Sequence, residues 1–173
     1  MQKTLGKLGA VWGVTGVTVM LIFATVRLGE TALEAMVGPL TGLQWTLLIV
    51  NVLFMAHAEG YKGFQKNFSP RVVARAKHVL THPSIANVVL APLFCMGFFN
   101  APRKRLIVTY AVTLGIVALV VVFRMLPQPW RGILDAGVVV GLTWGAISIL
   151  AFAGRALSGR DGDVSPELAR ASV

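Results

Sequence analysis

The stretch Leu106–Met125, LIVTYAVTLGIVALVVVFRM, decides the fold class of this chain. It is dense in Val, Leu and Ile, and it carries no charged side chain before Arg124. About 20 apolar residues in a helix cross the roughly 30 Å hydrocarbon core of a bilayer, so the stretch predicts a transmembrane helix. Three further apolar runs predict three more transmembrane helices, at about residues 8–26, 40–60 and 133–154.

The composition of the chain supports a lipid environment. Of its 173 residues, 55% are hydrophobic and 13% are charged, against roughly 45–50% and 25% in soluble domains. A soluble protein of this size has too few charges to cover so much apolar surface. We therefore expect an all-α, polytopic integral membrane protein with a single membrane domain, residues 1–154. Residues 155–173 are poor in apolar side chains and predict a flexible cytoplasmic tail.

The net charge of +9 and the isoelectric point near 10.7 would suggest a nucleic-acid partner for a soluble protein. Here the basic residues alternate with apolar runs, which is the pattern of orientation signals in a membrane protein. We therefore expect no nucleic-acid partner. The expected location is the cell membrane, crossed several times, with a bacterial inner membrane favoured.

The segment 85–101 leaves two topologies open, because it is short, interrupted by Ala91-Pro92, and contains Asn87 and Asn100. If it spans, about nine basic residues face one side and about seven the other. If the segment is re-entrant, about thirteen of the sixteen basic residues lie on the same side as both termini, which fits the positive-inside rule better. We favour a re-entrant segment with both termini cytoplasmic. A short fifth span is the alternative.

Residues 70–82 predict an amphipathic helix. Ser69 can cap its first turn, Pro70 suits the first helical position, and Pro83 ends it. Four side chains fall on one cationic face, and aliphatic side chains fill much of the other. A short helix with two such faces lies in the membrane interface instead of crossing the bilayer. The cationic face carries Arg71, Arg75, His78 and His82.

One face of the second span is polar. Asn51, Glu59 and Lys62 lie within roughly 80° on a helical wheel, together with Gln44 and Met55. An acid in or near the membrane is costly unless it is paired, and such acids often mark ion, proton or ligand paths. Glu59 is therefore a candidate proton-titrating or cation-pairing group. The simpler interpretation is a local pair with Lys62 at the headgroup level.

The strongest functional pattern is a basic cluster without acids from Lys62 to Arg105. Clusters of four to eight juxtamembrane bases attract anionic headgroups at roughly 1 kcal/mol per base, and arginine suits two-point contact with a phosphate. The expected partners are anionic membrane lipids, although such charges can also serve only to fix orientation. The cluster comprises Lys62, Lys66, Arg71, Arg75, Lys77, Arg103, Lys104 and Arg105. The predicted ligand-binding residues are Asn51, Glu59, Lys62, Arg71, Arg75, His78, Asn87, Arg103 and Arg105.

The histidines form a weaker pattern. His78 and His82 are four residues apart on one helical face, a spacing that two metal ligands can use, and His57 comes earlier. Arg71 and Arg75 share that face, however, and would repel a cation. We expect no metal site and no cofactor. The three histidines stay as a minor alternative metal set.

Glycines repeat every four positions in two spans. Gly137, Gly141 and Gly145 do so in the last span, and Gly9 and Gly13 in the first. Such faces permit close approach of helix backbones. We expect the first and last helices to pack on each other. A homo-oligomer or a partner membrane protein at the three glycines of the last span is the alternative.

Three functions follow from these patterns. The first is a small transporter or lipid-handling protein that recognises an anionic or phosphate-bearing group at its cytoplasmic face. The second is a non-catalytic membrane subunit or scaffold that docks partner membrane proteins. The third is a membrane enzyme that uses His57, Glu59, His78 or His82. We favour the enzyme least, because the sequence has neither a phosphate-binding glycine loop nor a Gly-x-Ser-x-Gly elbow.

Overall fold

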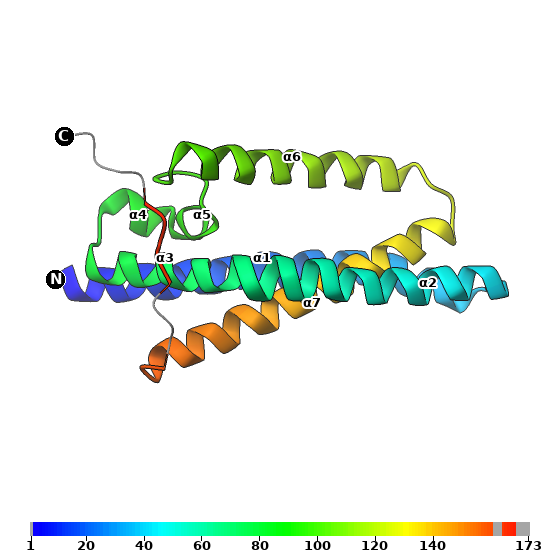
Figure 1. The fold of residues 1–173 in the computed structure, drawn as a ribbon, viewed down its shortest axis with the longest axis horizontal. Coiled ribbons are helices and arrows are strands. Elements are labelled where there is room, and N and C mark those ends of the chain that lie inside the picture. Colours follow the sequence, from blue (N-terminus) through cyan, green and yellow to red (C-terminus); the bar gives the residue numbers. More distant parts are fainter. Residues whose placement is uncertain (1, 161–163, 169–173) are drawn as a thin grey trace.

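The computed structural model describes residues 2–160 and 164–168, and within them the chain is helical with no strand. Long helices run back and forth along one axis, and α7 crosses them at an angle (Figure 1). The starts of α1 and α6 and the ends of α3 and α7 lie toward the same end of the molecule. In chain order the helices are α1 (Gln2–Val37), α2 (Gly42–Met55), the π-helix η1 (Ala56–Phe68), α3 (Ser69–Thr81), α4 (Ile85–Val89), α5 (Ala91–Met96), α6 (Arg103–Arg124) and α7 (Trp130–Leu157).

α2, η1 and α3 form one continuous helical rod, because the residues at both junctions have helical backbone angles. η1 is distinguished by wider i→i+5 bonding, as from Ser69 N–H to Phe64 O. The wider turn helps to accommodate Pro70, which has no N–H and whose ring would press on the preceding turn of a regular α-helix. The helix predicted at residues 70–82 is therefore present, and α3 begins at Ser69 as predicted. Ser69 does not cap a free helix end there, because η1 leads directly into α3.

α3 is not a separate amphipathic helix, because it continues the α2–η1 rod and is packed into the protein. Its aliphatic side packs against α1, α5 and α7, and Val72 and Val79 are fully buried there. A bare amphipathic helix would instead expose that face to lipid. Protein therefore covers the face that lipid was expected to cover, and the location of α3 at the membrane interface stays a prediction.

The first helix is much longer than the span predicted at residues 8–26. α1 continues to Val37 through the expected connector, which contains mostly good helix formers and only Gly29 as a weak breaker. It ends before Gly38-Pro39, since a proline disfavours helical angles in the residue that precedes it.

The segment 85–101 contains two short helices. α4 and α5 have five and six residues, so each is less than about 10 Å long and cannot cross a bilayer alone. Ser84 caps α4 by accepting a hydrogen bond from Asn87 N–H at 3.2 Å. Gly97 ends α5 with φ of 87°, a left-handed angle that favours glycine. The chain enters and leaves the segment at the same end of the molecule (Figure 1).

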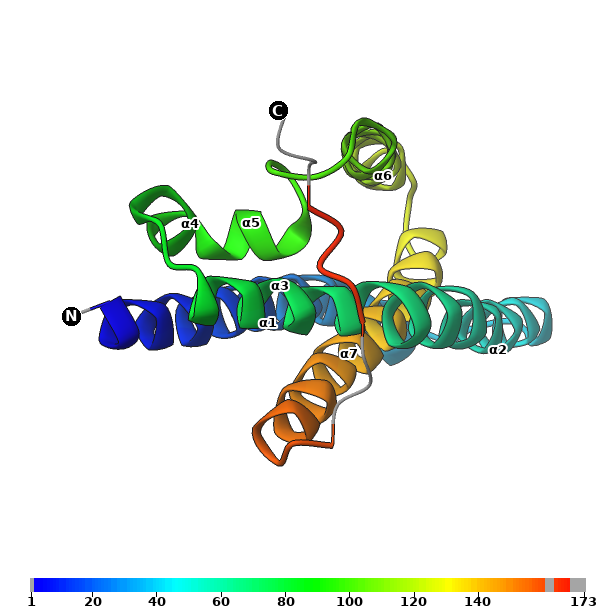
Figure 2. The same ribbon diagram turned by 60° about the vertical axis from the view of Figure 1, so that its left-hand side comes forward.

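The main core lies where α1, α3, α5 and α7 meet. Val17, Phe94 and Ile149 are almost fully buried in it, beside the α3 valines. A smaller cluster joins α1, α2 and α7. α6 belongs to neither cluster and has no buried residue, and it stands apart from the other long helices in both ribbon views (Figure 1, Figure 2). An apolar helix whose surface is not covered by the rest of the protein needs lipid or a partner protein around it.

Both glycine rows are covered from within the chain. A Cβ on Gly13 of α1 would lie 2.7 Å from the sulfur of Cys95, so α5 sits directly on the first row. A Cβ on Gly137 of α7 would overlap the Asn51 amide and lie 2.8 Å from Cγ of Met55 in α2. α1 and α7 do pack on each other. Of the α1 glycines, however, Gly13 faces α5 and Gly9 faces α3 and α4, and the glycines of α7 face the α2–η1 rod. The oligomer or partner expected at Gly137, Gly141 and Gly145 stays a prediction.

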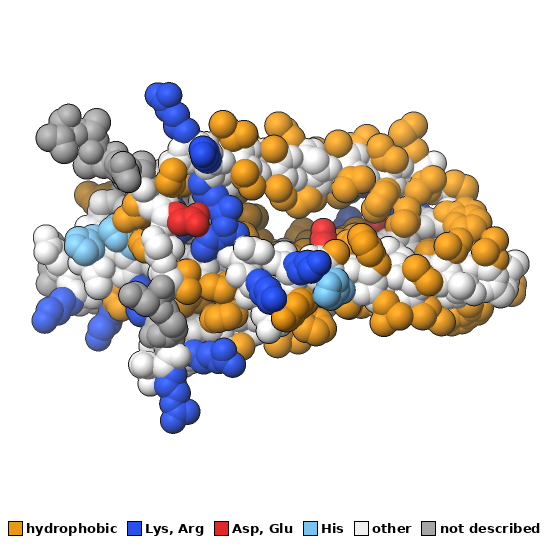
Figure 3. Space-filling model, in the orientation of Figure 1, with side chains coloured by type: hydrophobic (Ala, Val, Ile, Leu, Met, Phe, Trp, Pro, Cys, Tyr) orange, Lys and Arg blue, Asp and Glu red, His pale blue; other side chains and the backbone are white. Residues whose placement is uncertain are grey.

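Three helices among the described residues are long and apolar enough to cross a membrane, namely α1, α6 and α7. The span predicted at residues 40–60 falls on α2 and the start of η1, and α2 alone has 14 residues. Lysine and arginine side chains gather toward the end of the molecule where α1 begins, and hydrophobic side chains cover the other end (Figure 3). We call the first of these the basic end.

Replacing Gly137 by alanine tests the close contact between α7 and α2. The new methyl group meets Asn51 and Met55, so we expect the substitution to destabilise the protein by about 1–3 kcal/mol, the usual cost of overpacking. Thermal unfolding in detergent micelles, followed by circular dichroism, measures the change. Gly115→Ala in α6 is the matched control, because nothing lies within 4 Å of a Cβ there. Equal midpoints for the two variants would contradict this packing.

Candidate anion-binding pocket

Arg75 of α3 holds the end of α5 in place. The side chain is 3% exposed, and its Nε donates to Phe94 O at 2.6 Å. Nη2 donates to Phe99 O at 2.7 Å and to Asn100 O at 3.3 Å. The last carbonyls of a helix have no partner within it, and Arg75 supplies donors to the carbonyls at and after the end of α5. The Phe94 ring lies 4.1 Å from the guanidinium carbon, in cation–π contact.

Residues 164–168, which we call the strap, lie across α3 (Figure 1, Figure 2) and bind the rest of the guanidinium. Nη1 of Arg75 donates to Pro166 O at 3.0 Å and to Glu167 O at 3.1 Å. A guanidinium has five N–H groups, so Arg75 has no donor left for another ligand while the strap is in place. The predicted mobility of the tail stays a prediction, and residues 161–163 and 169–173 of that tail lie outside the described residues.

Carbonyl dipoles balance the charge of Arg75. Taking a charge out of water costs several kcal/mol, and burial accordingly lowers the pKa of Arg75 from its usual value. Five carbonyls and the Phe94 ring offset this cost, and arginine stays protonated at any physiological pH. Among the described residues Arg75 makes no ion pair. The surroundings of Arg75 therefore keep its positive charge.

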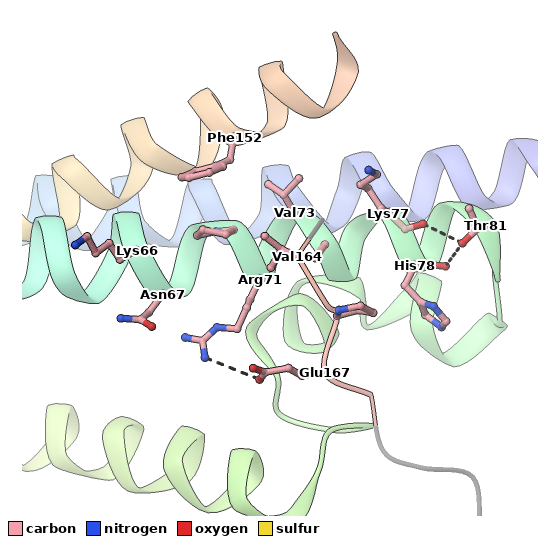
Figure 4. Close-up of a pocket in the computed structure, with 13 residues that line it drawn as sticks. Lys66, Asn67, Arg71, Val73, Lys77, His78, Thr81, Phe152, Val164 and Glu167 are labelled. Carbon is pink, nitrogen blue, oxygen red and sulfur yellow. Dashed lines mark hydrogen bonds and ion pairs between the residues drawn. The ribbon is translucent and has the colours of Figure 1, made fainter. Parts of the chain in front are cut away.

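A cavity of about 530 Å³ lies beside the strap, between α3 and α7 (Figure 4). One part of its lining is basic and another part is apolar. The basic side chains come from the end of η1 and from α3: Lys66, Arg71, Lys77 and His78. The apolar side chains come from α3, α7 and the strap, and include Val73, Phe152, Val164 and Pro166. A cavity with both kinds of lining can hold an anionic group together with an attached apolar chain.

The carboxylate of the strap lies between two arginines. Oε2 of Glu167 is 3.1 Å from Nε of Arg105 and 4.0 Å from Nη1 of Arg71, and the close-up shows Arg71 and Glu167 pointing toward each other (Figure 4). Arg71 belongs to α3 and Arg105 to the first turn of α6, so the carboxylate links the two helices. A phosphate oxygen bound by the same two arginines would take the same place.

His78 lines the pocket as a neutral side chain at pH 7. Burial lowers its pKa, and the nearby His82 and Arg75 lower it further. Its ring stacks on that of His82, with the ring centroids 4.9 Å apart. At neutral pH the positive charge around the pocket therefore comes from lysine and arginine.

The structure brings four of the predicted ligand-binding residues together around the pocket and the strap: Arg71, Arg75, His78 and Arg105. Lys62 and Arg103 are exposed and do not line the pocket. Asn87 is buried on α4, where its side-chain oxygen accepts from Nδ2 of Asn100 at 3.5 Å.

The polar face of the second span packs on α7. Nδ2 of Asn51 donates to Ile133 O at 2.8 Å. Glu59 covers Gly141, where a Cβ would lie 3.0 Å from its Oε2. Within the described residues Glu59 makes no hydrogen bond or ion pair, so the local pair with Lys62 is not formed. These residues do not line the pocket at the strap.

The three histidines are not brought together. His57 lies in η1 and contacts Tyr61, with ring centroids 5.8 Å apart, whereas His78 and His82 lie near the end of α3. In the part of the chain that the structure describes, no group of three His, Cys, Asp or Glu side chains is placed to hold a metal ion. The alternative metal set is therefore not assembled.

Most of the other residues that line the pocket were not predicted as site residues, and Glu167 of the strap and Phe152 of α7 are the most informative of them. Charge gives a signal for Glu167, because the acid-free basic cluster needs a counter-charge and the last residues of the chain contain acids. Phe152 gives no such signal, since in sequence it resembles any lipid-facing residue of the last span.

No family model, curated protein or solved structure matches this chain. Its function is therefore inferred from the pocket and the strap.

Arg75→Lys tests whether Arg75 holds the segment 85–101 against α3. Lysine has three donors on one nitrogen and cannot serve five carbonyls, so we expect the free energy of unfolding to fall by about 2–4 kcal/mol. Cys95 gives a local readout, because it is the only cysteine and is 2% exposed. Maleimide labelling of its thiol should become about tenfold faster as the segment opens more often.

Arg103→Lys is the control for this experiment. Arg103 is exposed and donates to no described residue, so its replacement should leave Cys95 labelling unchanged. If Arg75→Lys labels at the wild-type rate, the carbonyl contacts do not hold the segment.

Proposed function

We propose that four helical rods cross the membrane, namely α1, α2 with the start of η1, α6 and α7, and that residues 85–101 form a re-entrant segment. The length and apolarity of α1, α6 and α7 support this topology, as does the packing of the short α4 and α5 against α1. The positive-inside rule then places the basic end and both termini in the cytoplasm. A bacterial inner membrane is the location we propose.

We propose that the protein binds the phosphate-bearing headgroup of an anionic lipid in the pocket at the basic end. The observation that carries this proposal is the combined lining of the cavity: Lys66, Arg71 and Lys77 beside Val73 and Phe152. Arginine and lysine bind phosphate oxygens through charge-assisted hydrogen bonds, and the apolar side chains suit the first methylene groups of an acyl chain. The protein would hold or pass on such a lipid at the cytoplasmic leaflet.

The same arginines could bind free phosphate. A free phosphate leaves the apolar part of the lining in contact with water, whereas a lipid covers it and gains about 25 cal/mol for each Å² of apolar surface removed from water. We therefore favour the lipid as the source of the phosphate group.

A second candidate function is supported by α6. This helix has no buried residue and stands apart from the bundle (Figure 2), as a helix that docks a partner membrane protein would. Lipid alone can also cover it, so the pocket remains the better-supported basis for function. The hypothesis of a membrane enzyme has no such support among the described residues. Its candidate residues His57 and Glu59 lie in η1, away from His78 and His82 near the end of α3.

The pair of substitutions Arg71→Gln and Arg105→Gln tests the lipid proposal. The probe is dihexanoyl phosphatidylglycerol, titrated calorimetrically into the protein in uncharged maltoside micelles. At roughly 1 kcal/mol per base, loss of both arginines should weaken binding about thirtyfold. Inorganic phosphate, titrated in a second arm, should bind much more weakly than the lipid to the wild-type protein.

Arg103→Gln with Lys104→Gln is the matched control, because it removes the same charge, from the turn of α6 that also holds Arg105, at residues that neither line the pocket nor pair with Glu167. We expect it to reduce the affinity less than threefold, the effect of a distant charge. An equal loss in both pairs would mean that the basic end attracts anions without a specific site. Equal binding of inorganic phosphate and lipid would identify free phosphate as the ligand.

A further inference from the structure

The pocket already contains an anion, which the chain itself supplies. The carboxylate of Glu167 lies within 4.0 Å of both Arg71 and Arg105. Its side chain is 44% exposed, and those of the two arginines are about half as exposed, at 22% and 23%. The carboxylate is therefore held by the two arginines and is also open to exchange with a ligand from solvent or from the membrane.

The backbone of the strap is adapted to this contact. Glu167 has φ of 47°, a left-handed angle that is uncommon for residues other than glycine, asparagine and aspartate. With this backbone angle its carbonyl accepts from Arg75 while its carboxylate meets Arg71 and Arg105. Strained angles of this kind cost about 1 kcal/mol or more and persist where surrounding contacts hold them. The strap is thus held by the three arginines and by Leu168, which packs against the main core. It loses the arginine contacts together if a competitor takes them.

We propose that Glu167 is an internal ligand that a phosphate-bearing group displaces from the three arginines, releasing the strap. This inference rests on the proposed lipid binding and adds the regulation of the same site. Release frees Nη1 of Arg75, which now donates to Pro166 O and Glu167 O. The ligand then gains a third arginine beside Arg71 and Arg105.

The rest of the site stays in place when the strap leaves. Arg75 keeps its contacts to Phe94 O, Phe99 O and Asn100 O through Nε and Nη2, so the segment 85–101 remains fixed to α3. A carboxylate presents two oxygens to the arginines, and Oε2 of Glu167 is the oxygen that pairs with both, at 4.0 Å from Arg71 and 3.1 Å from Arg105. A phosphate has more oxygens and can form two-point contacts with several arginines at once. The exchange is therefore favourable for a ligand at sufficient concentration.

Glu167→Gln tests the proposal in the full chain. The variant keeps the backbone carbonyls of the strap but removes the competing charge, so dihexanoyl phosphatidylglycerol should bind about three- to tenfold more tightly than to wild type. Glu30→Gln in α1 is the matched control, because Glu30 is an exposed acid far from the pocket in α1 and its loss changes the net charge equally. It should leave the affinity at the wild-type value.

Hydrogen exchange gives a second, independent readout. In the wild-type protein, saturating dihexanoyl phosphatidylglycerol should speed amide exchange in residues 164–168 and leave α5 protected. Slower exchange of the strap on lipid binding would mean that the strap closes over the ligand, and would overturn the proposal.

The outcomes separate the two proposals. If wild type binds lipid through Arg71 and Arg105 but Glu167→Gln binds no more tightly, lipid binding stands and the internal ligand is wrong. If neither wild type nor Glu167→Gln binds the lipid, the proposed function fails and the internal ligand fails with it.

Discussion

The contact on which this structure most depends is the one between the Arg75 guanidinium and five backbone carbonyls. It joins α3, the end of the segment 85–101 and the strap, and it adds hydrogen bonds to the apolar packing of α5 and Leu168 on the main core. Backbone carbonyl dipoles and the Phe94 ring offset the free-energy cost of burying the Arg75 charge, and no ion pair with a described residue contributes. For that reason the contact leaves the region electropositive, and an electropositive site next to an apolar surface is what an anionic lipid requires.

Close backbone approach makes this arrangement possible. The glycine row of α1 allows α5 to lie against the helix axis, which carries Phe94 into reach of Arg75. The glycine row of α7 allows the α2–η1 rod to pack closely against α7. Because α3 continues this rod, the same packing sets the position of α3. Lipid does not drive helices together as water does, and small residues therefore contribute much of the packing between membrane helices. The pocket is a consequence of two such packings that meet at the basic end.

The sequence predicts the all-helical fold and the positions of α6 and α7 well, because long apolar runs leave few alternatives to a spanning helix. It predicts the basic cluster, and three arginines of that cluster, Arg71, Arg75 and Arg105, meet around the strap. It places the start of α3 at Ser69, but it does not predict that the π-helix η1 leads into α3 without a break. It also fails for the surroundings of α3, since an aliphatic face looks the same in sequence whether lipid or α1 covers it. Arg75 and Glu167 could not be assigned their roles, because a basic residue in a cluster carries no sign that it will bind carbonyls, and contacts between residues 75 and 167 depend on the whole fold.

The most direct test of this account is a structure of the protein in nanodiscs that contain phosphatidylglycerol. The account predicts phosphate density bound by Arg71 and Arg105, with Glu167 displaced and Arg75 still bonded to Phe94 O, Phe99 O and Asn100 O. Headgroup density elsewhere, with Glu167 still between the two arginines, would contradict it.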